Sequence, residues 1–223
     1  MALDLADYEA RARDAARSFW ESRGRGAAGD AMGGFYDLIA AVVRANGLAD
    51  AELQRGGALP GYFCPARPWG LLVLHGGRLV AALACKAEVG PAFDGFNALA
   101  DEAIGAAHDL QGAYRKGVFG QSPRPFVGWL ILVEDAPGSR TPVSDTSRHF
   151  PVFPAFQGAS YQQRYHLLCE RLVREQLYSA ACVITSPRTA AADGQYTELG
   201  ELTGLRTFVA SLAGHIATEA ARG

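Results

Sequence analysis

Apolar residues recur at spacings of three and four along the first 45 residues of the chain. The first run covers residues 3–23 and leaves arginines on its other side, a pattern typical of an amphipathic helix. The second run follows Asp30, which can cap a helix, and stops at Asn46 and Gly47. The chain is therefore expected to begin with two helices.

The pattern then changes to continuous apolar runs, after a Gly- and Pro-rich segment at residues 56–68 that is interpreted as a loop. Runs at residues 70–74 and 78–86 flank the turn His75-Gly76-Gly77 and predict a β-hairpin. The second run is apolar at nearly every position, which is typical of a central strand covered by helices on both faces.

Helical and strand patterns alternate in the second half of the chain. Helices are expected over residues 96–114, from Ser160 to 177 and within 198–221, and strands over 126–133 and 180–184. A Pro- and Ser-rich connection of more than twenty residues, 136–159, is long enough to suggest a functional loop. This order predicts an α/β sandwich, a central mixed sheet flanked by helices, in a single domain over residues 1–223.

Composition, net charge and cysteine spacing exclude several classes of function. The 223 residues are 49% apolar and carry a net charge of −2, which argues against non-specific polyanion binding but allows a local arginine-lined cleft. Neither a membrane span nor a signal peptide is visible, and the four cysteines are too widely spaced for a disulfide framework or a zinc ribbon. We expect a cytoplasmic protein without a membrane partner.

Lys86 ends the second strand of the predicted hairpin. An ammonium group there is costly unless it pairs with an anion or lies at the rim of the sheet. On composition alone, a lysine that simply reaches solvent from a strand end is the more ordinary explanation. The layout resembles the metal-dependent nucleases of the PD-(D/E)xK class, in which one acid opens the first strand, and a second acid and a lysine close the next. In that class the acids hold Mg²⁺, and the lysine stabilises the nucleophile or the developing charge.

Eight segments, in this order and nearly end to end, make the chain similar to the XhoI-type restriction endonucleases. They are LDLADYEARARDA (3–15), FYDLIA (35–40), VVRANG (42–47), LPGYF (59–63), EAIG (102–105), SPRPFVGW (122–129), HFPVF (149–153) and FVASL (208–212). The resemblance implies a restriction-endonuclease-like fold and a homodimer that cuts the palindrome CTCGAG with Mg²⁺.

The chain departs from the family pattern where that chemistry should lie. The family has an aspartate where this chain has Gly70, and Glu-Phe-Lys where it has Ala84-Cys85-Lys86; an Asn-Asn-Arg cluster is also lost at residues 97–99. Without anionic oxygen ligands, a divalent ion that enters the site loses coordinated water molecules and gains no protein ligands to replace them. Cleavage should fall by orders of magnitude, and we expect no cofactor, with Mg²⁺ only if carboxylates have relocated.

Relocated carboxylates have candidates nearby. Glu88 is the first, because alternate residues of an ideal strand share a face with Lys86. Asp94, Asp101 and Glu102 lie around the start of the next helix. A Gly-Pro break after Glu88 is expected to end the strand there, which weakens the case for an intact metal site.

A thiol offers a different chemistry. Cys64 precedes the hairpin, and beside Lys86 it would have a lowered pKa and could act as a nucleophile or a soft ligand. Cys85 is expected to face the opposite side of the sheet and to pack as a small apolar residue. No two histidines have metal-ligand spacing, and no Ser/His/Asp triad can be placed.

Three hypotheses follow. The first is a non-cleaving homodimer that binds double-stranded DNA, with Arg124, Arg140 and Arg148 touching phosphates or guanines unless they are ordinary surface charge. The second is the same fold reused as a small-molecule enzyme or interaction protein, in a pocket around Cys64 and Lys86. The third is an active Mg²⁺-dependent type II endonuclease that uses a relocated carboxylate, Glu88 first.

Overall fold

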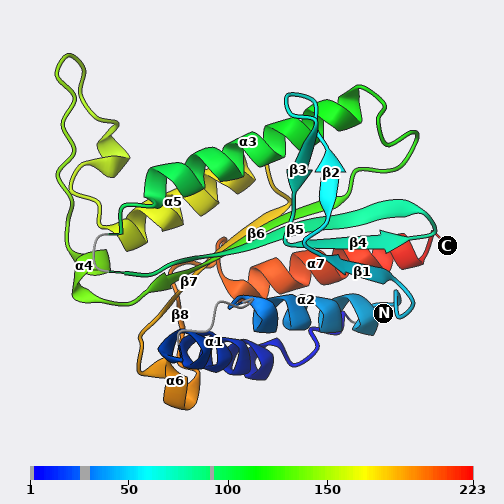
Figure 1. Ribbon diagram of the computed structural model, residues 1–223, viewed down its shortest axis with the longest axis horizontal. Helices are drawn as coiled ribbons and strands as arrows, with labels where there is room; N and C mark the ends of the chain where they lie inside the picture. The colour runs from blue at the N-terminus through cyan, green and yellow to red at the C-terminus, as the bar shows by residue number, and fades with distance from the viewer. Residues whose placement is uncertain (1–2, 26–30, 91–92, 223) are drawn as a thin grey trace.

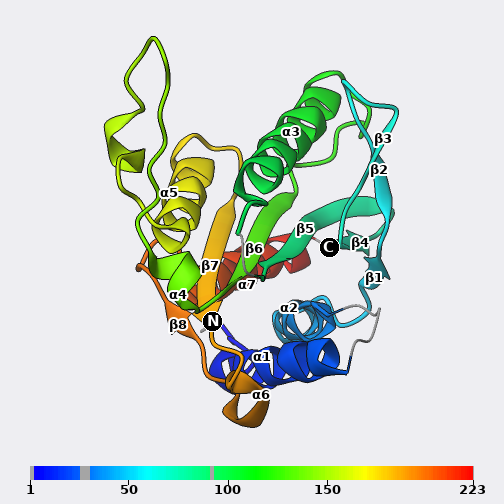
Figure 2. The ribbon, with the colours of Figure 1, turned by 60° about the vertical axis from the view of Figure 1, so that its left-hand side comes forward.

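The computed structural model describes residues 3–25, 31–90 and 93–222, and it has three layers (Figure 1). A central sheet is covered on one face by two helices, which lie side by side in the turned view of Figure 2. Two further helices cover the other face, and the N-terminal helix packs on one of them. The covering helices are α3 (Phe96–Arg115) and α5 (Tyr161–Arg174) on the first face, and α2 (Gly33–Ala45), α7 (Leu205–Ala220) and α1 (Tyr8–Gly24) on the second.

The main sheet has six strands in the order β1-β4-β5-β6-β7-β8. The inner pairs β5–β6 and β6–β7 are parallel, and the remaining pairs are antiparallel. Each parallel pair is joined by one of the helices on the first face, as a crossover requires. The strands are β1 (Glu52–Arg55), β4 (Leu71–His75), β5 (Arg78–Glu88), β6 (Phe126–Glu134), β7 (Ala180–Ser186) and β8 (Thr197–Glu198).

The core lies on both faces of the sheet. All nine residues of β6 are buried: Phe126, Leu130 and Leu132 contribute to the face under α2 and α7, whereas Trp129 and Ile131 contribute to the face under α3 and α5. A strand between two helical layers has no polar face, which explains the continuous apolar runs. Within the described part of the chain, no helix combines the length and apolarity that crossing a bilayer requires.

A projecting loop follows the short helix α4 (Pro137–Arg140) and returns through a 3₁₀ turn, η1 (Pro154–Phe156), to α5. Figure 1 shows it standing away from the three layers. Its residues Phe150 and Phe153 are 76% and 63% exposed. The long connection expected from the sequence is therefore a surface feature with apolar side chains facing outward.

The predicted α/β sandwich with a mixed sheet and two N-terminal helices is confirmed. The structure adds short elements that the sequence analysis did not predict, since strands of two to four residues carry little periodicity: β1, β8, and the two-stranded sheet of β2 (Ala58–Pro60) and β3 (Ala66–Pro68) within the supposed loop. The final segment holds one helix, and a four-residue helix, α6 (Ala190–Asp193), precedes β8. The predicted cap Asp30 falls outside the described residues.

Candidate functional site

Gly70, Ala84 and Lys86 come together at a small cavity of about 60 Å³ on the α3 face of the sheet. Strand β4 begins at Leu71, so Gly70 immediately precedes it. Ala84 and Lys86 lie on the neighbouring strand, β5. The alternation of a strand sends Cys85 to the opposite core, as expected. The hairpin therefore brings together the three positions that the sequence analysis predicts to correspond to the acids and the lysine of the family pattern.

Tyr36 of α2 fills the space beside Gly70. Its hydroxyl accepts a hydrogen bond from the backbone N–H of Cys85 at 3.1 Å and lies 3.5 Å from the carbonyl oxygen of the same residue. A Cβ atom at position 70 would overlap that hydroxyl and come within 2.5 Å of the ring carbon that carries it. As Tyr36 lies in this structure, it leaves no room for a side chain, including a carboxylate, at position 70.

Lys86 pairs with a carboxylate from α3. Its Nζ donates to Oε1 of Glu102 at 2.6 Å, and both side chains are partly exposed, at 31% and 45%. Glu102 lies on the second turn of α3, the helix that crosses over this end of the hairpin. The cation at the end of β5 is therefore neutralised by the protein itself.

The donor set around Lys86 does not fit a magnesium ion. Mg²⁺ prefers near-octahedral oxygen coordination, usually with one or two carboxylates held ready for it. The cavity offers the single carboxylate of Glu102, already paired, together with the hydroxyl of Tyr36. Among the residues that the structure describes, no group of three or more His, Cys, Asp or Glu side chains could hold a metal ion.

Glu88, the first candidate for a relocated acid, has other partners. Its carboxylate accepts a hydrogen bond from the hydroxyl of Tyr165 at 3.1 Å and one from the backbone N–H of Gly95 at 3.4 Å. Burial and the neighbouring carboxylate raise the pKa of Tyr165, which keeps the phenol protonated as a donor. Glu88 does not line the cavity of Lys86, and it ties the end of β5 to α3 and α5.

Cys64 lies in the turn between β2 and β3 and does not line the cavity of Lys86. Its backbone N–H and that of Phe63 donate to the buried carboxylate of Asp109, at 3.4 and 2.6 Å, and the guanidinium of Arg67 pairs with the same carboxylate. Burial alone would raise the pKa of Asp109, but these hydrogen bonds hold it below its usual value. The turn is thus anchored to α3 by an ionised aspartate.

The three predicted DNA-contacting arginines lie apart. Arg124 and Arg140 flank opposite ends of β6, whose nine residues span roughly 30 Å. Arg140 makes two hydrogen bonds of 2.5 Å to Asp135, which neutralise its charge locally. Arg148 is exposed on the projecting loop. Their contact with DNA stays a prediction.

Sequence reasoning missed Tyr36, and it named Glu102 only among several possible acids. Tyr36 belongs to the buried side of α2, where its ring adds to the core. One signal was available: the hydroxyl group of a tyrosine on the core side of a helix usually needs a hydrogen-bond partner within the protein. That signal does not say which strand supplies the partner.

Comparison with known proteins identifies one family of similar sequences. The family model described as "Restriction endonuclease XhoI" matches residues 13–198. Similar proteins are the type II restriction enzyme XhoI of Xanthomonas vasicola, 46% identical over 194 residues that cover 78% of each chain, and AbrI of Azospirillum brasilense, 50% identical over 67% of this chain and 77% of the relative. BstVI of Geobacillus stearothermophilus is 36% identical over 90% of this chain and 93% of its own. No solved structure matches.

Proposed function

The chain belongs to the XhoI family of restriction endonucleases, and on that basis we propose that it is a homodimer that binds double-stranded DNA and does not cleave it. The observation that carries the proposal is the content of the Lys86 cavity. Metal-assisted hydrolysis needs anionic oxygens that hold the ion and its water. Tyr36 occupies the room for one such group, and the carboxylate of Glu102 is paired with Lys86.

Cleavage is tested with a supercoiled plasmid that carries CTCGAG, incubated with Mg²⁺ or Mn²⁺. We expect no nicking above that of Lys86→Met prepared in parallel. Nicking by the wild-type protein that disappears in Glu102→Gln would overturn the proposal and indicate an active nuclease with a relocated acid. Glu88→Ala distinguishes the two candidate acids, because Glu88 lies outside the cavity.

DNA binding is tested with a labelled CTCGAG duplex and a scrambled duplex at several salt concentrations. We expect binding that weakens steeply with salt, because phosphate contacts release counterions. Arg148→Gln should lower the salt slope by about one unit, whereas Arg140→Gln should change it less, since Arg140 already pairs with Asp135. Arg115→Gln is the matched control. A protein that binds neither duplex would support the reuse of the fold away from DNA.

The homodimer is tested by sedimentation. We expect a species of twice the chain mass of 23.7 kDa at concentrations that support DNA binding. A protein that sediments as a monomer, with and without duplex, would contradict the proposed homodimer. Binding to a palindrome by two copies follows from their shared two-fold symmetry.

A further inference from the structure

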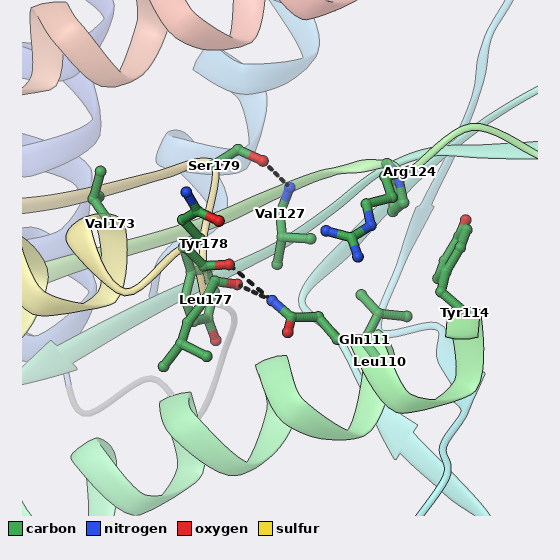
Figure 3. A pocket seen from close by; sticks show the side chains of 11 residues that line it. Leu110, Gln111, Tyr114, Arg124, Val127, Val173, Leu177, Tyr178 and Ser179 are labelled. Carbon is green, nitrogen blue, oxygen red and sulfur yellow. Dashed lines mark hydrogen bonds between the residues drawn. The ribbon is translucent and has the colours of Figure 1, made fainter. Parts of the chain in front are cut away.

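A second and larger cavity, of about 350 Å³, lies on the same face of the sheet, between α3 and the residues that lead from α5 into β7 (Figure 3). Tyr178 lines both this cavity and that of Lys86. The volume falls in the range of small-molecule sites. Nothing in the proposed DNA-binding function requires a cavity of this kind.

The cavity has an apolar interior. Leu110 of α3, Val127 of β6, Val173 of α5 and Leu177 line it (Figure 3). The backbone carbonyl oxygens of Gln176 and Leu177 are already satisfied, since the side-chain amide of Gln111 donates to both, at 2.9 and 3.4 Å. This part of the cavity therefore suits an apolar group rather than a polar one.

Two hydrogen-bond donors at the cavity lack partners. The hydroxyl group of Tyr114 is buried and makes no hydrogen bond, while its ring stacks on Phe119 with the centroids 4.3 Å apart. Arg124 is exposed, and within the described chain its guanidinium makes neither an ion pair nor a hydrogen bond. Figure 3 shows both side chains on one side of the cavity.

The ligand class follows from the guanidinium and the apolar residues. A guanidinium can only donate hydrogen bonds, so its partner is an acceptor. A carboxylate matches a planar guanidinium through two parallel, charge-assisted hydrogen bonds. We propose that this cavity binds a small organic acid, with its carboxylate at Arg124 and an aryl or branched-alkyl body against the apolar residues.

The test is calorimetric titration of the full chain with hydrocinnamate and isocaproate, compared with the neutral amides of the same acids. We expect each acid to bind at least about tenfold more tightly than its amide, the size of one charge-assisted hydrogen bond. Arg124→Gln should abolish that difference. Arg115→Gln, next to Tyr114 but outside the cavity, should change nothing.

Two results would overturn the inference. One is equal binding, or no binding, of acids and amides by the wild-type protein. The other is a preference for the acids over the amides that survives Arg124→Gln. Thermal unfolding of each variant shows that it is folded before titration. If Arg124→Gln weakens only the duplex and hydrocinnamate never binds, Arg124 contacts the DNA backbone and the organic-acid site is rejected, whereas the proposed DNA binding stands.

Discussion

Two cavities on the same face of the sheet differ in whether their polar groups have hydrogen-bond or ion-pair partners. Around Lys86 every charged or hydroxyl group has a partner from the protein: Tyr36 binds the backbone of Cys85, and Glu102 binds the ammonium. Around Tyr114 a hydroxyl and a guanidinium are left without one in the described chain. A buried donor without a partner costs free energy. The polar groups at the cavity of Lys86 thus satisfy one another, whereas those at the neighbouring cavity do not.

The largest expected effect comes from forcing a side chain into the closed cavity. Gly70→Ala should lower the free energy of unfolding by about 3 kcal/mol, because its Cβ overlaps Tyr36. In a Tyr36→Leu background the same change should cost at least about 1 kcal/mol less. Urea denaturation of the four proteins measures this coupling.

The matched control is Gly24→Ala at the end of α1, where no atom lies within 4 Å of the added Cβ. It should be nearly neutral. If Gly70→Ala were equally neutral in the wild-type background, Tyr36 would not exclude side chains from position 70, and the closed cavity would lose its explanation.

A smaller and pH-dependent effect is expected at the anchored turn. Asp109→Asn should cost about 2 kcal/mol at neutral pH, because it leaves the guanidinium of Arg67 without its anion and weakens two backbone hydrogen bonds. The folded pKa of Asp109 lies below 3.8, so the carboxylate stabilises the fold above that value and the benefit is lost as pH falls through the folded pKa.

Unfolding of wild type and Asp109→Asn should therefore converge in acid. The exposed Asp101→Asn on the same helix provides the control and should show neither the neutral-pH loss nor the convergence. A constant difference between wild type and Asp109→Asn over the whole pH range would contradict the ionised anchor.

Removing one hydroxyl from each of two tyrosines contrasts a satisfied group with an unsatisfied one. Tyr178 donates to the carbonyl oxygen of Ala103 at 2.9 Å, and Tyr178→Phe should cost about 1 kcal/mol. Tyr114→Phe should be neutral or stabilising, because it removes a buried hydroxyl without a partner. Thermal unfolding compares the two, and an equal loss in both variants would mean that Tyr114 has a partner.

The smallest effect is expected from the ion pair at Lys86. A double-mutant cycle with Lys86→Met and Glu102→Gln should give a coupling of about 0.5 kcal/mol, because both side chains are partly exposed. The coupling should shrink in high salt. A coupling of several kcal/mol would instead identify the pair as a buried structural element.

The long central strands were predictable and the short edge strands were not. Strands β5 and β6 are continuous apolar runs because helices cover both faces of the sheet. Such a run can be recognised in the sequence. Strands β2 and β3 have three residues each, within a Gly- and Pro-rich segment, and their pairing depends on where the turn is anchored. The anchor Asp109 lies on α3, more than forty residues further on.

The site was predictable only as far as one hairpin fixes it. Lys86 and Ala84 share a face because alternation within a strand is local. The contact between Tyr36 and Cys85 joins residues 49 positions apart, and it depends on how deeply α2 packs against the sheet. No local pattern in the sequence indicates how deeply α2 packs against the sheet. The partner of Lys86 likewise depends on the crossing of α3, so sequence reasoning could name Glu102 only as one acid among several.

The overlap between positions 36 and 70 also constrains how this protein can change over generations. A single codon change that puts an aspartate at position 70 meets the ring of Tyr36 and destabilises the fold before it can confer any benefit. The reverse order, in which Tyr36 is first replaced, removes core packing and the partner of a backbone amide. Each change alone should destabilise the fold, so an aspartate at position 70 is expected to require a compensating change at position 36.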